Sequence, residues 1–281
     1  MAINVYQMVT DRIIAEMEKG VIPWEKPWTG KGNGAWNRQT GKPYSLLNQF
    51  LLGKPGEYLT YKQCTEAGGK VKKGEKSSIC VFWKQIPIEE EENGVKKTKL
   101  VPMLRYYNIF HIDQCEGIEQ KHNKLTDDGK AIEFDPIEEA ENVLTAYLTR
   151  EGIKLENVLG DKACYRPSFD DIILPRRDQF QIAEEYYSTA YHEAVHSTGH
   201  ASRLNRLKST HFASGEYSKE ELVAEIGAAI SLNRLGIETA KQFKNSAAYI
   251  QSWLNVLKED NRIIVTAASK AEKAVNLIFG G

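Results

Sequence analysis

The chain has 281 residues, 41% of them hydrophobic and 27% charged, which is the composition of a globular protein of one large or two modest domains. Its net charge of −1 indicates no partner class, and no apolar run approaches the roughly 20 residues that span a membrane. The start lacks the charged and apolar regions of a signal peptide, and four scattered cysteines without a C-x-x-C pair argue against a disulfide scaffold or a cysteine metal site. We therefore expect a cytoplasmic protein that does not bind membranes.

The first elements along the chain predict a domain that mixes helices and strands. Apolar spacing and glycine breaks predict three helices, at residues 6–19, 44–52 and 58–67. Two strand-like runs follow at residues 77–84 and 99–110, and the turn pair Asn93-Gly94 lies between them. This half of the chain is expected to be α+β.

Charge in this half is uneven. Between Lys26 and Lys84 there are eleven Lys or Arg against three Asp or Glu, a local excess of +8 that the whole-chain value hides. Aromatic residues are interleaved with these cations, a combination that suits single-stranded DNA, because cations follow phosphates and flat rings stack on bases. The candidate contacts are three tryptophans and four lysines: Trp28, Trp36, Trp83, Lys70, Lys72, Lys73 and Lys76. The alternative is that the rings are core and the lysines solvated surface. No recognition-helix motif of a duplex reader is evident.

A polar stretch at residues 121–135 is the predicted linker between a domain at 1–120 and a second at 136–281. The second domain is expected to be mostly helical with a small sheet. Its predicted helices occupy residues 136–151, 181–197, 218–236, 247–258 and 263–277, and a strand-like run covers 163–174.

The helix at 181–197 carries an H-E-x-x-H motif. His192 and His196 are four residues apart, so both imidazoles leave one face of the helix and can bind one metal ion. Glu193 lies about 100° round the helix, beside the open coordination position. There it can act as general base toward a metal-bound water, whose pKa zinc lowers to about 7.

A third ligand is needed, and the sequence leaves three candidates. The metzincin pattern fails because its third histidine position is Ser202. The other pattern takes a glutamate from a second helix, where Glu221 and Glu225 share one face and Glu220 is adjacent. Glu221 is the first choice, with Glu225 supporting a ligand histidine through its free N–H. Alternatively, Ser218 and Glu221 form a capping box, which explains Glu221 but not Glu225.

The expected cofactor is Zn²⁺, and the same ligands accept Mn²⁺ or Fe²⁺. A structural metal is the alternative, although it leaves Glu193 unexplained. The sequence therefore predicts a zinc metallopeptidase.

H-E-x-x-H followed by E-x-x-A-E resembles the thermolysin-like gluzincins, in which the first acid binds zinc and the second supports a ligand histidine. Longer motifs resemble ArdC-type antirestriction proteins. In the C-terminal half these are Tyr165-Arg166-Pro167, His192-Glu193-Ala194-Val195-His196-Ser197-Thr198-Gly199-His200 and Glu220-Glu221-Leu222-Val223-Ala224-Glu225. In the N-terminal half they are Ile22-Pro23-Trp24, Tyr58-Leu59-Thr60-Tyr61-Lys62-Gln63 and Tyr107-Asn108-Ile109-Phe110.

That resemblance implies a domain that binds single-stranded DNA joined to a zincin-like metallopeptidase domain. It further implies a mobile genetic element as the source and protection of incoming DNA from host restriction during conjugation. Two alternatives stay open. The chain could be a protease that cleaves a host restriction or defence protein, or an accessory transfer or replication protein without proteolysis.

Overall fold

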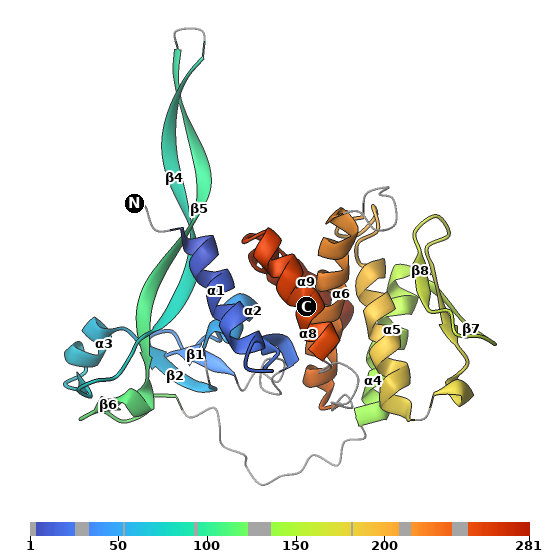
Figure 1. Ribbon diagram of the computed structural model, residues 1–281, viewed down its shortest axis with the longest axis horizontal. Helices are drawn as coiled ribbons and strands as arrows, with labels where there is room; N and C mark the ends of the chain where they lie inside the picture. Colours follow the sequence, from blue (N-terminus) through green and yellow to red (C-terminus); the bar gives the residue numbers. More distant parts are fainter. Residues whose placement is uncertain are drawn as a thin grey trace.

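The structure is a computed structural model that describes residues 4–25, 34–52, 54–92, 95–122, 136–180, 182–207, 215–237 and 247–281. Figure 1 shows strands and a long hairpin in the N-terminal half beside a group of helices and a small sheet in the C-terminal half. The expected α+β class is confirmed. Among the described helices, none combines the length and apolar character needed to cross a membrane.

The first helix, α1 (Val5–Met17), confirms the helix expected near the start. The Asn4 side chain caps it by accepting a hydrogen bond from a backbone N–H of the first turn. Three apolar residues at a spacing of four are buried on one face: Val9, Ile13 and Met17. α1 packs against α8 (Ala247–Glu259) and α9 (Ile263–Phe279), so the start of the chain contacts its last helices.

The N-terminal half is built on a four-stranded sheet with the order β1-β2-β5-β4. β1 (Ala35–Asn37) is parallel to β2 (Gly56–Leu59), and the remaining pairs are antiparallel. β4 (Ser78–Glu92) and β5 (Val95–His111) are longer than the two predicted strands, and together they project from the body as a hairpin (Figure 1). The predicted turn at 93–94 lies outside the described residues.

The helix predicted at 58–67 starts later than expected. Residues 56–59 form β2 instead, because they pair with both β1 and β5. α3 (Tyr61–Glu66) begins after Thr60, whose side chain accepts from the Gln63 N–H while the Gln63 side chain accepts from the Thr60 N–H. The other short elements of this half are η1 (Pro23–Glu25), α2 (Leu46–Leu51), β3 (Lys70–Val71), η3 (Ile112–Gln114) and β6 (Cys115–Glu116).

The C-terminal half matches the helices predicted for it. Its described elements before α8 are α4 (Pro136–Glu151), β7 (Lys154–Val158), β8 (Cys164–Arg166), β9 (Asp171–Pro175), η4 (Arg177–Gln179), α5 (Ala183–Ser197) and α6 (Gly215–Leu235). The single strand expected at 163–174 is wrong, because the chain turns at residues 167–170 and forms the antiparallel pair β8 and β9. The small sheet has the order β7-β9-β8, so β8 lies at an edge among the described strands.

One hydrophobic core extends across both halves. It contains Ile13 and Phe50 from the N-terminal half together with Tyr147, Leu222 and Ile264 from the C-terminal half. α2 packs against α9, and η1 packs against α6. The division into domains at 121–135 stays a prediction, and residues 123–135 of that linker lie outside the described part of the chain.

Candidate metal centre and nucleic-acid interface

The candidate metal centre lies between α5 and α6, which pack closely (Figure 1). A glycine in α6 permits this approach. A Cβ atom at Gly227 would lie 2.8 Å from one methyl carbon of Val195 in α5 and 2.9 Å from the other. Both distances are well below the about 3.5 to 4.0 Å of ordinary carbon contacts. The missing side chain therefore sets the distance between the two helices that carry the predicted ligands.

Three side chains converge at this contact. The Nε2 atoms of His192 and His196 are 3.1 Å apart, and the Glu221 carboxylate lies 3.5 Å from the first and 3.4 Å from the second. Two ligands about 2.1 Å from a tetrahedral ion are about 3.4 Å apart, so these separations fit one such ion. The ligand atoms of the three residues all lie within 4.8 Å of one another. Two imidazoles and one carboxylate form a His₂Glu set, which leaves a fourth position for water.

The other two acidic candidates face the opposite nitrogens of the imidazole rings. Glu225 lies 3.7 Å from Nδ1 of His192, and Glu220 lies 3.6 Å from Nδ1 of His196. A carboxylate at Nδ1 orients the ring and presents Nε2 to the ion. The geometry thus separates three glutamates that the sequence left as rivals: one faces the Nε2 atoms, and each of the others faces one Nδ1.

Arg206 holds Glu220 in place, and the sequence analysis did not find it. Its guanidinium donates to both Glu220 oxygens, at 2.8 and 3.2 Å, and to the Val195 carbonyl at 2.8 Å. The Arg206 side chain is only 5% exposed. A basic residue just beyond the end of a helix that carries ligands is the signal that could have revealed it, because such residues satisfy the last carbonyls.

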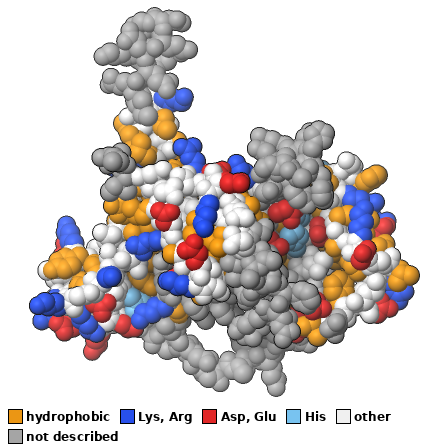
Figure 2. Space-filling view, in the orientation of Figure 1, with side chains coloured by type: hydrophobic (Ala, Val, Ile, Leu, Met, Phe, Trp, Pro, Cys, Tyr) orange, Lys and Arg blue, Asp and Glu red, His pale blue; other side chains and the backbone are white. Residues whose placement is uncertain are grey.

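Electrostatics at the site favour a cation. Burial alone would lower the pKa of His196, but Glu220 and Glu221 outweigh burial and raise that pKa to about 9. Burial likewise opposes ionisation of Glu221, yet the two histidines hold the pKa of its carboxyl well below the usual range. The site therefore carries excess negative potential, which a divalent ion would neutralise in place of the proton. In Figure 2, histidine and acidic side chains lie together on the face where Figure 1 places α5 and α6.

Glu193, the predicted general base, is buried at 7% exposure. One of its oxygens accepts a hydrogen bond of 2.7 Å from the backbone N–H of Tyr165 in β8. This bond links the H-E-x-x-H helix to the edge strand of the small sheet. The Glu193 carboxylate therefore lies against β8.

Tyr165 is itself fixed by a polar network that the sequence analysis missed. Its hydroxyl donates to Asp170 at 2.6 Å and accepts from Arg203 at 3.2 Å. Arg203 also pairs with Asp170 and donates to the carbonyl of Ser197 at the end of α5, at 2.8 Å. The network ties the β8 edge to the C-terminal end of the helix that carries both histidines.

The alternative in which Glu221 closes a capping box is wrong. α6 begins at Gly215, three residues before Ser218, so Ser218 lies inside the helix and is not its N-cap. Glu221 therefore lies in the second turn of α6, where its side chain is 26% exposed and faces the two histidines.

The four predicted lysines lie on or just after β3. All are exposed, and two already have partners: Lys70 pairs with Glu116 at 2.9 Å, and Lys72 donates to the Asp113 carbonyl at 2.7 Å. Lys73 and Lys76 complete the group.

The three tryptophans predicted to contact DNA differ in their exposure to solvent. Trp83 on β4 is 51% exposed, and its ring meets the Tyr6 ring edge-on at 6.3 Å between centroids. Trp36 is 1% exposed within β1, so the expectation that it stacks on a base is wrong, and its ring supports the sheet. Trp28 lies outside the described residues. Phe82, next to Trp83, is 41% exposed and was not among the candidates.

Comparison with known proteins identifies both halves. The profile of the N-terminal domain of anti-restriction factor ArdC matches residues 3–110, and that of a zincin-like metallopeptidase matches residues 139–270. The Mn(II)-bound crystal structure of antirestriction protein ArdC from plasmid R388 superposes with a TM-score of 0.73 at 36% identity, over 98% of this chain and 97% of that one. The chain belongs to the ArdC antirestriction family. The metal-free structure of R388 ArdC gives a TM-score of 0.70 at 35% identity, over the same shares of both chains.

Other relatives place this ArdC-type segment in larger proteins. Two Escherichia coli proteins named DNA primase TraC are 34% and 35% identical over 95% and 98% of this chain, which spans only 19% and 27% of their length. Protein y4eC of Sinorhizobium fredii is 30% identical, over 96% of this chain and 90% of its own.

Proposed function

We propose that this ArdC-family chain is a metal-dependent peptidase joined to a module that binds single-stranded DNA, and that it protects DNA entering a cell from restriction. The observation that carries the peptidase part is the convergence of both Nε2 atoms and the Glu221 carboxylate at separations that fit one tetrahedral ion. The Mn(II)-bound state of R388 ArdC supports a divalent ion, Zn²⁺ or Mn²⁺, as the cofactor of this chain.

Each residue then has a chemical role. His192, His196 and Glu221 would hold the ion, which supplies an activated water and polarises a carbonyl. Glu193 would accept the proton of the attacking water on its carboxylate and pass it to the amine as the peptide C–N bond breaks. Its bond to the Tyr165 N–H keeps the base beside β8, whose edge can pair with an extended substrate. Glu220 and Glu225 orient the imidazoles.

The test of the peptidase part compares wild type with Glu193→Gln, loaded with Zn²⁺ or Mn²⁺, on a mixture of unfolded polypeptides. New N-termini found by mass spectrometry with wild type, and lost in Glu193→Gln at equal metal content, are the expected result. Equal cleavage by both proteins would exclude Glu193 as the base. Absence of cleavage by the loaded wild type would favour a structural metal.

The DNA-binding part rests on the exposed Trp83 and on the exposed lysines around β3. Membership of the ArdC family and the relatives named DNA primase also connect this segment with proteins that act on DNA. We expect the chain to prefer a single-stranded oligonucleotide to the matching duplex, with affinity falling as salt rises. Equal affinity for both, or none for either, would remove this part of the proposal.

A second candidate function is a metal-dependent peptidase whose substrate is a host restriction or defence protein. The catalytic variant separates the two. If Glu193→Gln protects plasmid DNA during transfer as well as wild type does, protection comes from DNA binding; if protection is lost, cleavage of a host protein is the better account. An accessory transfer role without proteolysis predicts that plasmid transfer is normal with wild type and with Glu193→Gln, and that neither protein protects the DNA from restriction.

A further inference from the structure

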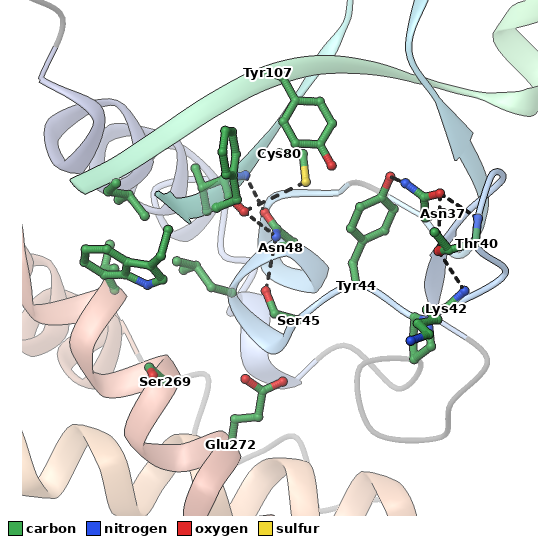
Figure 3. A pocket seen from close by; sticks show the side chains of 17 residues that line it. Asn37, Thr40, Lys42, Tyr44, Ser45, Asn48, Cys80, Tyr107, Ser269 and Glu272 are labelled. Carbon is green, nitrogen blue, oxygen red and sulfur yellow. Dashed lines mark hydrogen bonds between the residues drawn. The ribbon is translucent and has the colours of Figure 1, made fainter. Parts of the chain in front are cut away.

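A cavity of about 440 Å³ lies where the N-terminal sheet meets α9 (Figure 3). Its volume falls within the range of about 300 to 1,000 Å³ that is usual for small-ligand sites. Both halves of the chain contribute to its wall. The lining residues that matter to the argument are Tyr44, Phe82, Trp83, Tyr107, Ser269 and Glu272.

Aromatic surface is open to solvent at this cavity. Trp83 is 51% exposed, and its ring meets the Tyr6 ring of α1 edge-on at 6.3 Å between centroids. Phe82 precedes it on the opposite face of β4, is 41% exposed and meets the Tyr107 ring edge-on at 5.6 Å. Exposed aromatic side chains gathered at a cavity mark a binding site more often than scattered ones do. Flat rings of this kind offer stacking faces to a base.

The polar groups of the cavity suit the edge of a base. Burial, followed by the nearby Cys80, raises the pKa of Tyr44 to about 12, and burial also raises the pKa of Tyr107, so both phenols stay protonated. On α9, Glu272 accepts a hydrogen bond from the Leu46 N–H at 3.0 Å and presents a carboxylate to the cavity. A carboxylate accepts from the N–H groups that bases carry.

The arrangement also suits the phosphate that accompanies a base. Figure 3 shows Lys42 and Thr40 beyond Tyr44 at one end of the cavity, and Ser269 and Glu272 across from them on α9. Lys42 is exposed, so its ammonium can reach a backbone phosphate outside the cavity while a base lies inside.

We propose that this cavity binds one unstacked base of single-stranded DNA, held against Trp83 and hydrogen-bonded at Glu272 of α9. The inference rests on the single-strand binding proposed above and adds a specific site to it. Because α9 belongs to the C-terminal half, that half takes part in DNA binding. The site also lies apart from the metal centre, which is formed by α5 and α6.

The test fills the cavity from the C-terminal half. Ser269→Trp places a large side chain in the cavity, whereas Thr266→Trp adds the same side chain at an exposed α9 position outside the lining. The full chain is titrated into a short single-stranded oligonucleotide with 2-aminopurine at one position, followed by anisotropy and by base fluorescence. We expect Ser269→Trp to weaken binding about tenfold, the effect of losing one stacked base, and to abolish the change in 2-aminopurine fluorescence that accompanies binding to wild type, while Thr266→Trp behaves as wild type.

A second pair removes the stacking face instead of blocking the cavity. Trp83→Ala should also weaken binding about tenfold, and Phe169→Ala, which truncates a 72% exposed aromatic outside the cavity, should not. This pair keeps the test decisive if Ser269→Trp fails to fold.

The outcomes separate the two proposals. If wild type binds the single strand and both Ser269→Trp and Trp83→Ala bind it equally well, the cavity is not a base site, although single-strand binding stands. If wild type does not bind the single strand, the proposed DNA-binding function fails and the cavity proposal fails with it.

Discussion

Adding one methyl group at Gly227 should weaken metal binding without removing any ligand. In Gly227→Ala the new Cβ would lie 2.8 Å from a Val195 methyl carbon, so the helices must separate by about 0.7 Å to restore ordinary contact. Val195 cannot turn away, because it is fully buried and a β-branched side chain in a helix has one strongly preferred rotamer. Metal ligands tolerate displacements of only about 0.2 Å, so binding of the proposed ion between α5 and α6 should be affected first.

The magnitude follows from two opposing effects. Overpacking costs about 1 to 3 kcal/mol, and alanine in place of glycine within a helix contributes about 1 kcal/mol of stability. The net loss of stability is therefore at most about 2 kcal/mol, within what a domain survives. Affinity for the ion should fall at least about tenfold, as for other changes that shift ligand orientation.

The assay is a competition titration of Zn²⁺ against a chromophoric chelator, with thermal melts of the metal-free proteins alongside. The matched control is the double variant Gly227→Ala/Val195→Ala, which removes the opposing methyl groups and should recover much of the affinity. Wild-type affinity in Gly227→Ala would refute the account of helix spacing. Failure of the double variant to recover would show that the effect does not pass through Val195.

Three further predictions concern charge. Metal must displace the proton of His196, whose pKa is raised to about 9, so apparent Zn²⁺ affinity should rise with pH up to about 9; an affinity that is flat from pH 6.5 to 8.5 would contradict this. Glu220→Gln and Glu225→Gln should each lower metal affinity about 10- to 100-fold in the same titration, and unchanged affinity would remove their role at Nδ1. Burial opposes the ionised form of Glu57, but hydrogen bonds from the N–H groups of residues 121 and 122, and then from Arg38, outweigh burial and lower the pKa of its carboxyl. The ionised carboxylate therefore stabilises the fold above about pH 4.5, and this stabilisation is lost as pH falls through the lowered pKa. Glu57→Gln should accordingly lower the free energy of unfolding at pH 7 by about 3 kcal/mol, and acid should lower the stability of this variant little further. In the control Glu66→Gln, at an exposed position, stability at pH 7 and its dependence on pH should both match wild type.

The parts of the site that lie within one element could be predicted from the sequence. Both histidines and Glu193 sit in a single helix, where a spacing of four fixes the shared face before any tertiary contact is known. The same local logic located α4, α8 and α9, whose apolar spacing is regular.

Features that depend on tertiary packing were harder to predict from the sequence. Three glutamates lie within six residues of α6, and only the approach of α5 across Gly227 separates their roles. Local helix signals also left a capping box at Ser218 as an alternative, since nothing in the sequence shows that α6 starts earlier.

The aromatic residues show the same limit. Trp36 and Trp83 have similar basic surroundings in the sequence, yet one is buried in the sheet and the other is half exposed on the hairpin. Composition cannot distinguish a core ring from a stacking ring, because both uses favour large aromatics. The cavity at α9 could not be predicted from the sequence either, since its two walls are more than 150 residues apart in the chain.

The most direct test of the central claim is the metal content of purified wild type, Glu221→Gln and Glu193→Gln after equilibration with Zn²⁺ and removal of free ion. The account predicts one ion per chain in wild type and in Glu193→Gln, and a large loss in Glu221→Gln, because Glu221 is the carboxylate that faces both Nε2 atoms among the described residues. Full metal content in Glu221→Gln, or equal loss in Glu193→Gln, would contradict the His₂Glu site and the separate role of the base.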